Sequence, residues 1–553
     1  MTRGGMGTLT APLPHDRGRP APLPGTNSTM HTATGSKAAV RGRNAALVAA
    51  LLGWLFDGFE MGLFPLVGPR ALEDLLGAAA GKEVATAWFG SIMAVFLVGA
   101  ACGGVFFGWL GDRIGRVRAM SLSILTYSLF TGLCGLAQTP VQIAAARFIA
   151  SLGMGGEWAL GVALVSELWP DASRPLLAGL IGAAANAGYL LVALVSIMLT
   201  RIAGAAHDGL VQAGLSAATV DWLTRGDAWR LLMMAGAVPG LLVFFIRMAV
   251  PESARWEESR AHGGTSHWAT RDLLGVLGGS LAVLGIVAVW MPGGLAATAG
   301  GLVAAVVTLA AFLVSAGGFL LPVLGYLRRA QAAGAIAADA SGRVVRTMLL
   351  AACLSGVALM GTWGSMQWLP KWAIGLDKAA VAAGGQAGWQ VKETTQIATS
   401  IGAIVGTLAV ALLAGRFGRR IVYAGLCLAS LATIALLYRG TTGYGWGFLG
   451  ASFLAATTTA GFYGWFPLAL PELFPTVVRT TAQGFAYNFG RVLAAVGSLQ
   501  TAPLIAAFSR GLDPARAELD AFPRAGLTLS AIYLVGLVLV WLIPETRGRP
   551  LPD

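Results

Sequence analysis

The sequence predicts an all-α polytopic membrane protein, and three observations support this fold class. The 553 residues are 56% hydrophobic and only 12% charged, with a mean hydropathy of +0.70. Apolar runs long enough to cross a membrane recur along the chain, and basic residues gather in the short loops between them. Soluble proteins carry about 25% charged residues, so this composition excludes several soluble domains. The net charge of +12 therefore indicates the positive-inside pattern of a membrane protein, and we expect no nucleic-acid partner.

A bilayer core of about 30 Å requires about 20 helical residues, and six runs in the first half satisfy this. A charge-free stretch, 273–327, follows and is too long for one crossing. Because Arg271 precedes it and Arg328 follows it, the positive-inside rule predicts two crossings there. Six more runs bring the expected total to about fourteen spans. The single spans expected are 45–68, 88–110, 119–137, 141–166, 176–200, 230–250, 347–369, 394–414, 421–438, 445–470, 480–508 and 525–543.

The chain is expected to contain five segments. Residues 1–44 are rich in proline and are expected to form a disordered cytoplasmic tail. Residues 45–255 and 346–545 each supply a six-helix bundle, 256–345 form a linker with the two extra helices, and 546–553 form a second cytoplasmic tail. Arginine clusters follow the second and tenth spans, whereas loops on the other side mix charges of both signs. Both termini are therefore expected on the cytoplasmic side of the plasma (inner) membrane.

Short motifs occur twice at an offset of about 300 residues, which indicates an internal duplication. Each copy falls at the equivalent predicted helix end of its own half. We therefore expect two pseudo-symmetric six-helix bundles with a central two-helix insertion. The repeated motifs are Glu167-Leu168-Trp169-Pro170 with Arg174 and Glu472-Leu473-Phe474-Pro475 with Arg479, Asp112 to Arg116 and Gly415 to Arg419, and Pro251-Glu252-Ser253 and Pro544-Glu545-Thr546.

These motifs resemble those of the major facilitator superfamily. The loop from Gly108 to Arg116, Gly-Trp-Leu-Gly-Asp-Arg-Ile-Gly-Arg, is similar to the signature between the second and third helices of that family. The start of the fourth span at Arg147 and the terminal Pro-Glu-Thr-Arg-Gly also fit. The resemblance covers nearly the whole chain beyond residue 45. It implies the major facilitator fold and transport of a small molecule by alternating access between the two bundles.

Within the superfamily, the sequence looks most similar to the proton-coupled carboxylate branch, which includes sialic acid and aromatic acid transporters. Asp57-Gly58-Phe59 in the first span and Gly155-Gly156-Glu157-Trp158 in the fourth carry this resemblance. The two extra central helices resemble those of sialic acid transporters. Glu60 stands where the aromatic acid group has Asp, and Gly415 replaces the Asp of the first loop motif. The resemblance implies a secondary active transporter that carries a small organic anion together with protons.

Four charged residues inside predicted spans are candidates for proton coupling, because ionisable groups in a bilayer are costly and usually functional. Asp57 and Glu60 lie three residues apart, on one face of the first span, where burial and mutual repulsion favour a protonated carboxyl. Glu157, in the fourth span, could accept the proton or pair with an arginine. Arg147 occupies a position tied to coupling in the superfamily. The alternatives are ion pairs that only fix helix packing and, for Arg147, a side chain that extends to the outer interface.

Arg491 is the main substrate-binding candidate. It lies twelve residues beyond Arg479, roughly 18 Å into its span, where an arginine cannot lose its charge. Its planar guanidinium suits a carboxylate, and the alternative is an internal pair with Glu157 or Asp57. The polar and aromatic candidates for the cavity wall are Asn186, Tyr189, Trp363, Gln367, Tyr463, Tyr487 and Asn488.

Charged residues at the predicted cytoplasmic helix ends lie too far from the membrane centre to contact a substrate there. We expect them to form a network that holds the two bundles together and releases them as the bundles rock. Anchoring by the positive-inside rule would explain the arginines but not the repeated glutamate. The residues are Asp112, Arg113, Arg116, Glu167, Arg174, Glu472 and Arg479.

The sequence offers little support for an enzyme or a primary pump. All five histidines fall in predicted tails or loops, and neither a Ser-His-Asp arrangement nor a phosphate-binding Gly-x-x-x-x-Gly-Lys-Ser/Thr loop occurs. We therefore expect no enzymatic activity and no metal or cofactor. A sugar or polyol porter and a non-transporting nutrient sensor on the same fold stay open as alternatives. We expect a monomer in the lipid bilayer whose partners are its small-molecule substrate and protons.

Overall fold

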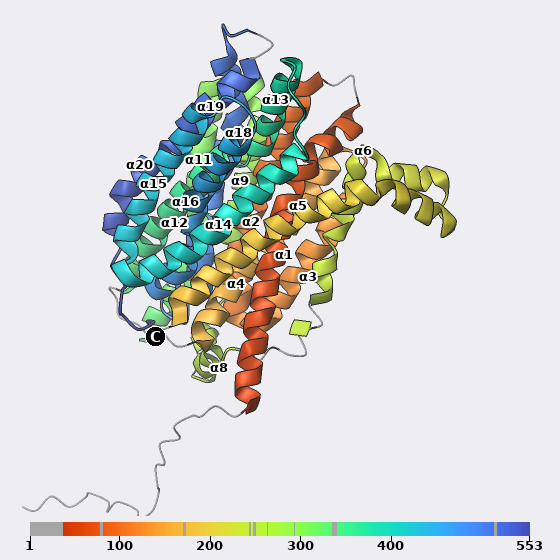
Figure 1. Ribbon diagram of the computed structural model, residues 1–553. Helices are drawn as coiled ribbons and strands as arrows, with labels where there is room; N and C mark the ends of the chain where they lie inside the picture. Colours follow the sequence, from red (N-terminus) through yellow and green to blue (C-terminus); the bar gives the residue numbers. More distant parts are fainter. Residues whose placement is uncertain are drawn as a thin grey trace, which may run out of the picture. The chain divides into compact units, whose positions relative to one another are not determined.

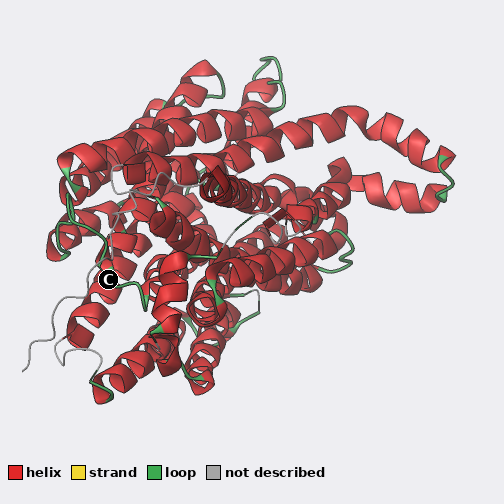
Figure 2. Ribbon diagram, turned by 90° about the horizontal axis from the view of Figure 1, so that it is seen from below, coloured by secondary structure: helices red, strands yellow, loops and turns green. Residues whose placement is uncertain are grey.

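The computed structural model describes residues 37–77, 81–169, 173–242, 245–246, 250, 252–262, 264–291, 293–334, 340–513 and 517–552. Residues 1–41 form one unit and residues 42–553 another. Of the first unit only 37–41 are described, so most of the expected tail, 1–44, lies outside the described residues. The described part of the second unit is built from helices without a strand (Figures 1 and 2), which agrees with the predicted all-α class.

Six helices form the first half, in the order of the first six predicted spans. They are α1 (Lys37–Leu76), α2 (Gly81–Ile114), α3 (Arg116–Cys134), α4 (Pro140–Leu168), α5 (Arg174–Gln212) and α6 (Ala217–Ala235). α1 begins ahead of the predicted first span, at Lys37. α6 is interrupted at Arg225–Ala228, and the sixth span continues through the 3-10 helix η3 (Val238–Leu241) into a region that is only partly described. α5 extends beyond its predicted end and forms with α6 a hairpin that projects from the other helices (Figures 1 and 2).

The central insertion forms the two predicted crossings, α9 (Leu273–Trp290) and α11 (Gly301–Ala332), joined through the short helix α10 (Leu295–Thr298). The short elements α8 (Ala254–Ala261), η4 (Gly264–His267) and η5 (Thr270–Asp272) precede it. Arg329 at the end of α11 forms an ion pair of 2.5 Å with Asp272 before α9, so both ends of the insertion lie on one side. α9 packs on α2 and α18, and α11 contacts α17, so the insertion touches both halves.

The second half repeats the order of the first with more interruptions. Its elements are α12 (Ala340–Ser365), α13 (Leu369–Ala382), α14 (Val391–Phe417), α15 (Arg419–Gly440), α16 (Trp446–Ala469), η6 (Pro471–Leu473), α17 (Arg479–Asn488), α18 (Gly490–Ser509), α19 (Ala517–Ser530), α20 (Ile532–Leu539) and η7 (Val540–Leu542). The predicted span 480–508 corresponds to α17 and α18, and 525–543 to α19, α20 and η7.

Twelve helical segments of the described chain are long and apolar enough to cross a membrane. α16, which occupies the predicted span 445–470, and the partly described sixth span are additional to these twelve. The arrangement therefore accommodates the expected total of about fourteen crossings.

Equivalent helices of the two halves pack in the same way. α4 packs closely on α2, and α16 packs closely on α14. A Cβ at Gly155 of α4 would lie 2.0 Å from the Ala100 carbonyl oxygen, and a Cβ at Gly406 of α14 would lie 1.9 Å from the Thr457 carbonyl oxygen. Only glycine permits such close backbone contact, which is the packing mode expected where lipid removes the hydrophobic preference between helices.

The two ends of the helix bundle can be told apart by their charges. The end that carries the α2–α3 and α14–α15 loops, with Arg116 and Arg419, is called the basic end below. α8 and the C-terminal residues lie at this end (Figure 1). The other end carries the α13–α14 loop and is called the opposite end.

Candidate functional site

A cavity with about 1010 Å³ of empty space lies between the two halves. α1, α4 and α5 of the first half and α12, α13, α14, α16, α17 and α18 of the second half line it. A largely apolar cavity with a few charged and polar side chains suits a small-molecule ligand. The wall is largely apolar and includes six aromatic side chains, and Asp57 and Arg491 are its only charged residues within the described chain. The aromatic lining residues are Trp54, Trp158, Tyr189, Trp363, Tyr463 and Tyr487.

Arg491 lies in the first turn of α18 and is only 2% exposed. Its guanidinium donates to the Met154 sulfur at 3.2 Å and lies 5.3 Å from the centroid of the Tyr487 ring. Its Nε has no hydrogen-bond partner, and the described residues supply no ion pair to it. The sequence left open an internal pair with Asp57 or Glu157, but neither pair forms. A buried cation therefore faces the cavity without a carboxylate in contact with it, although Asp57 and Glu60 act on it electrostatically from a greater distance.

Asp57 and Glu157 form a second polar group beside the cavity. Asp57, on α1, lines the cavity, and Glu157, on α4, is buried behind it next to Gly53. The two carboxyls interact with each other, and the Tyr127 hydroxyl from α3 is close to both. No described residue forms an ion pair with Asp57 or Glu157. Two neighbouring buried carboxyls cannot both stay ionised at low cost, so the pair is suited to hold a proton.

Glu60 and Arg147 pair with each other away from the cavity. The Arg147 guanidinium donates to Glu60 Oε1 at 2.9 Å, and the Thr131 hydroxyl donates to the same oxygen at 3.0 Å. Arg147 is fully buried, with its guanidinium 4.3 Å from the centroid of the Phe96 ring, so it does not extend to the interface. Asp57 and Glu60 therefore differ in surroundings although they share one helix.

Six further predicted cavity residues line the wall, namely Asn186, Tyr189, Trp363, Gln367, Tyr463 and Tyr487. The Gln367 amide donates to the Tyr189 hydroxyl at 3.5 Å across the two halves. The Asn186 amide donates to the Gly182 carbonyl within α5 at 2.8 Å.

Asn488, which the sequence analysis gives as a candidate substrate contact, is not among the residues that line the cavity. Its amide donates to the Gly155 carbonyl of α4 at 3.0 Å, and it fills the space next to Gly104 of α2. It joins the two halves at a glycine contact.

Several lining residues escaped the sequence analysis. Trp158, next to Glu157, stacks on Tyr487 with ring centroids 3.8 Å apart and so bridges the halves. Gln396 and Ser400 on α14 also face the cavity. Neutral polar residues in a span give a weak sequence signal because their cost in a membrane is small compared with that of a charge. Their spacing of four residues on one helix face is the only signal that could have singled them out.

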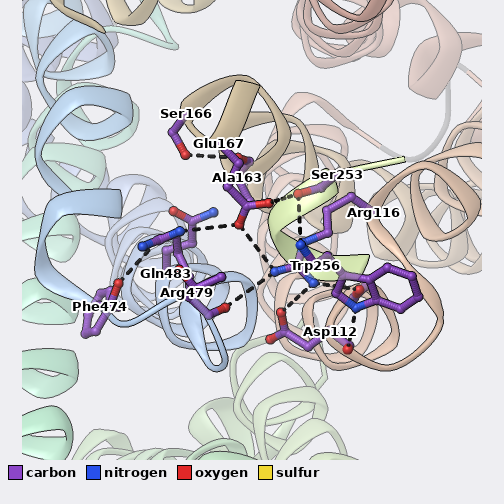
Figure 3. Close-up of polar contacts among 12 residues, drawn as sticks. Asp112, Arg116, Ala163, Ser166, Glu167, Ser253, Trp256, Phe474, Arg479 and Gln483 are labelled. Atoms are coloured by element: carbon purple, nitrogen blue, oxygen red, sulfur yellow. Dashed lines mark hydrogen bonds and ion pairs between the residues drawn. The ribbon is translucent and has the colours of Figure 1, made fainter. Parts of the chain in front are cut away.

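Glu167 is the centre of a charged cluster at the basic end (Figure 3). Its Oε1 accepts from Arg116 of the same half at 3.4 Å and from Arg479 of the other half at 3.3 Å, and its Oε2 accepts from the Ser253 hydroxyl at 2.5 Å. Glu167, Arg116 and Arg479 are members of the network that the sequence predicts between the halves, and Ser253 is an additional member. One carboxylate thus joins the first half to the N-terminus of α17.

Asp112 supplies a second connection between the halves at this end. Its Oδ2 accepts from the backbone N–H of Thr481 at 2.9 Å and from the Thr481 hydroxyl at 2.6 Å. Because Thr481 is in the first turn of α17, the carboxylate caps a helix of the other half and complements its dipole. Arg116 pairs with Asp112 at 3.1 Å and joins it to Glu167.

The second half contains an equivalent cluster around Glu472. Arg419 forms an ion pair of 2.6 Å with Glu472, and the Thr546 hydroxyl donates to Glu472 at 2.6 Å, as Ser253 does to Glu167. Burial raises the pKa of Glu472 even though Arg419 and Thr546 oppose that shift. Burial also acts on Glu545, but the backbone N–H groups of residues 419, 420, 546 and 547 outweigh it and hold its pKa below the usual value.

Arg113 and Arg174, like Glu472, lie apart from the Glu167 cluster. Arg113 is exposed and donates to the Thr270 hydroxyl at 2.8 Å, so it ties α2 to the insertion. Arg174 is buried at the start of α5 and acts electrostatically on Glu472 of the other half. Arg174 and Glu472 thus occupy the positions that Arg479 and Glu167 occupy in the other copy.

Contacts between the halves also occur toward the opposite end. The N-terminal turn of α14 supplies most of them, and Glu393 there is 1% exposed although its Oε2 has no hydrogen-bond partner. The cavity therefore lies between two sets of contacts. Those toward the opposite end are Ser196 to Glu393 at 3.1 Å, Lys392 to Asp227 at 3.5 Å and Lys371 to Thr86 at 3.1 Å.

Comparisons with known proteins agree with this architecture. A family model described as "Sugar (and other) transporter" matches residues 44–274 and 385–553. The chain is 26% identical over 502 residues to the "Probable 4-methylmuconolactone transporter" of Cupriavidus pinatubonensis, covering 90% of each chain. It is 25% identical over 509 residues to the "Cis,cis-muconate transport protein" of Acinetobacter baylyi, covering 91% of this chain and 95% of that protein.

Solved structures show the same fold. The E. coli protein XylE, described as a major facilitator superfamily proton:xylose symporter, matches with a TM-score of 0.60 at 17% identity, covering 93% of this chain and 98% of that chain. The predicted major facilitator fold is thereby confirmed.

Proposed function

The chain belongs to the sugar (and other) transporter family, and on that premise we propose that this membrane transporter is a proton-coupled symporter of a small organic anion. It moves a small molecule and is not an enzyme.

The unpaired Arg491 carries this proposal. A buried arginine keeps its charge, and a buried charge without a partner costs several kcal/mol. A carboxylate in the cavity would remove that cost through a charge-assisted, bidentate contact. A sugar or polyol, which is neutral, would leave the guanidinium without a counter-ion. The relatives from Cupriavidus and Acinetobacter are named for 4-methylmuconolactone and cis,cis-muconate transport, and cis,cis-muconate is an organic dicarboxylate.

Proton coupling is assigned to Asp57 and Glu157. Asp57 is open to the cavity and Glu157 supports it from behind, so a proton taken up from the cavity can be shared by the two carboxyls. The Tyr127 hydroxyl offers one further hydrogen-bonding group to this pair. Glu60 and Arg147 neutralise each other, so their proposed part is to fix α1 against α3 and α4.

Alternating access would use the two sets of contacts around the cavity. The cluster of Glu167, Arg479, Asp112 and Thr481 closes the basic end, and its release would open the cavity there. The excess of arginine at this end supports a cytoplasmic location in the plasma membrane, with both termini on that side. We propose a monomer, because the cavity lies within one chain.

The test compares Arg491→Gln and Arg491→Lys with the wild-type protein, and Arg439→Gln, an exposed arginine on α15, is the control. Aromatic monocarboxylates, sialic acids and sugars are screened by thermal shift and then by uptake into proteoliposomes, because a ligand stabilises the folded protein by mass action. Arg491→Gln should weaken carboxylate binding by roughly tenfold to a hundredfold, since hydrogen bonds to charged groups contribute about 1.5–3 kcal/mol. Arg491→Lys should fall between. The proposal that the substrate is an organic anion bound by Arg491 would be excluded by unchanged carboxylate uptake in Arg491→Gln. Sugar uptake that does not depend on the residue at position 491 would also exclude it.

A further inference from the structure

The α14 wall of the cavity carries two neutral polar side chains that the chain itself does not satisfy. The Ser400 hydroxyl is buried and has no hydrogen-bond partner, and Gln396, one turn earlier, is 7% exposed. No hydrogen bond of the Gln396 side chain is formed within the described chain, and both residues line the cavity. Buried polar groups in folded proteins are nearly always paired, so the unpaired Ser400 hydroxyl, with the Gln396 amide beside it on the cavity wall, indicates a ligand group or water there.

Other hydroxyls in the cavity wall differ from these two. Thr459 on α16 donates to the Ala455 carbonyl at 2.8 Å, and Thr362 on α12 donates to the Ala358 carbonyl at 2.9 Å. The hydroxyls of these threonines therefore have hydrogen-bond partners within their own helices. Among the described lining residues, the buried polar atoms without a partner are the Ser400 hydroxyl on α14, Arg491 Nε on α18, and Trp54 Nε1 and Asp57 Oδ1 on α1; Ser400 is the only neutral hydroxyl among them.

Gln396 and Ser400 lie on a different wall from Arg491. α14 packs against α5 and α16, whereas α18 packs against α2, α12 and α19. The two helices therefore line different sides of the cavity. Aromatic rings, including the stacked Trp158 and Tyr487, complete the lining. A ligand whose carboxylate reaches Arg491 could thus present a flat body to the rings and its other end to α14.

The charges of the cavity restrict the chemistry of that other end. Arg491 is the only cation in the described lining, and the α14 wall offers only an amide and a hydroxyl. A second carboxylate there would be buried without a counter-ion, which is costly. A hydroxyl, carbonyl or ring nitrogen would instead match groups that can both donate and accept hydrogen bonds.

We propose that Gln396 and Ser400 form a second subsite, which binds a neutral hydrogen-bonding group at the far end of a monocarboxylate substrate. This inference rests on the proposed function, because Arg491 must hold the carboxylate for the far end to reach α14. It makes the two residues determinants of specificity: the protein selects monoanions with a distal neutral polar group over dianions of the same shape.

The test uses three probes with the same ring: benzoate, 4-hydroxybenzoate and terephthalate, a 1,4-dicarboxylate. Binding to the detergent-purified full chain is measured by calorimetry for wild type, Ser400→Ala, Gln396→Leu and the double variant. Wild type should bind 4-hydroxybenzoate roughly threefold to tenfold more tightly than benzoate, the range expected for one neutral hydrogen bond, and terephthalate most weakly. The double variant should lose the preference for the hydroxyl and bind benzoate as wild type does.

Ser452→Ala is the matched control. Ser452 on α16 is also a buried hydroxyl without a partner, but it does not line the cavity, so its removal should leave the ratio of the two affinities unchanged. If the double variant does not fold, Ser400→Ala alone decides the question, because it removes one atom without adding volume.

An affinity ratio that is equal in wild type and the variants overturns the subsite, as does tighter binding of terephthalate than of benzoate. The Arg491→Gln variant separates this outcome from failure of the proposed function. If Arg491→Gln abolishes benzoate binding while the α14 variants change no ratio, only the subsite is wrong. If wild type binds none of the probes, or Arg491→Gln binds benzoate as wild type does, the proposed function fails together with the inference.

Discussion

Replacing Asp57 by asparagine should separate substrate exchange from proton-driven accumulation. In the cavity, a monocarboxylate adds one negative charge beside Arg491, and one proton on the Asp57 and Glu157 pair adds one positive charge. The loaded transporter would then carry the same net charge as the empty one. An asparagine at this position could donate a hydrogen bond to Glu157 but could not titrate, so the empty and loaded states would no longer differ by a proton.

The size of the effect follows from this charge balance. One pH unit corresponds to about 1.4 kcal/mol per proton, so wild type should accumulate a monocarboxylate about tenfold across a gradient of one unit. A membrane potential of 100 mV is worth about 2.3 kcal/mol per elementary charge, or roughly fiftyfold, but it should add nothing to an electroneutral cycle. Asp57→Asn should reduce the accumulation ratio to about one.

Proteoliposomes with a defined internal pH, with and without a potassium-diffusion potential, allow both quantities to be measured with a labelled substrate. Counterflow exchange in the same vesicles should persist in Asp57→Asn, which shows that the variant is folded and binds substrate. Asp520→Asn, an exposed carboxyl on α19, is the control for the change of residue type. Tenfold accumulation by Asp57→Asn, or accumulation that follows the membrane potential in wild type, would refute the reasoning.

Two further variants test the buried ion pairs. Glu167→Gln should weaken closure of the basic end, because it leaves Arg479 of the other half without its carboxylate. Breaking a buried pair in this way typically costs about 3–5 kcal/mol, so the melting temperature and the transport rate should both fall, and an unchanged melting temperature would contradict the assigned contact. Glu60→Gln should destabilise the protein by leaving Arg147 buried and unpaired, whereas the double variant Glu60→Leu with Arg147→Met should recover much of that stability. Retained proton-driven accumulation in the double variant would confirm a packing role, and its loss would assign coupling to this pair.

The architecture could be predicted from the sequence because the determining signals are large. A membrane demands long apolar helices, and the duplication places equivalent motifs at equivalent helix ends. Glu167, Arg479 and Arg116 could be grouped because a repeated glutamate at a helix end has no role in simple anchoring. Arg491 could be singled out because a guanidinium in a span must have a functional or structural reason.

Three features of the site were beyond the reach of sequence reasoning. Residues three apart on a helix point about 60° apart, and this angle directs Asp57 to the cavity and Glu60 to Arg147. Asn488 has the composition of a ligand contact, but Gly155 of another helix offers it a carbonyl. Gln396 and Ser400 are neutral, so nothing in the sequence marks them as costly. For Glu60 and Asn488 the deciding partner comes from a distant segment of the chain.

The positions at which the two halves carry different residues account for the most specific features of the site. Asn186 and Arg491 both line the cavity at equivalent positions of the two halves, and the Asn186 amide is satisfied within its own helix. Arginine at both positions would give the cavity two cations and favour a dianion. Because one position carries Asn186 and the other Arg491, the cavity should prefer a substrate with one negative charge.

The same argument applies at the basic end, where Asp112 caps α17 while its counterpart is Gly415. A Cβ at Gly415 would lie 2.8 Å from the Pro175 ring of α5, so the second half has no room there for an acidic side chain. The closure contact made by the loop motif therefore depends on one copy of the motif only. A Gly415→Asp variant, which restores the sequence symmetry, should for this reason push α5 and α14 apart and not create a second cap.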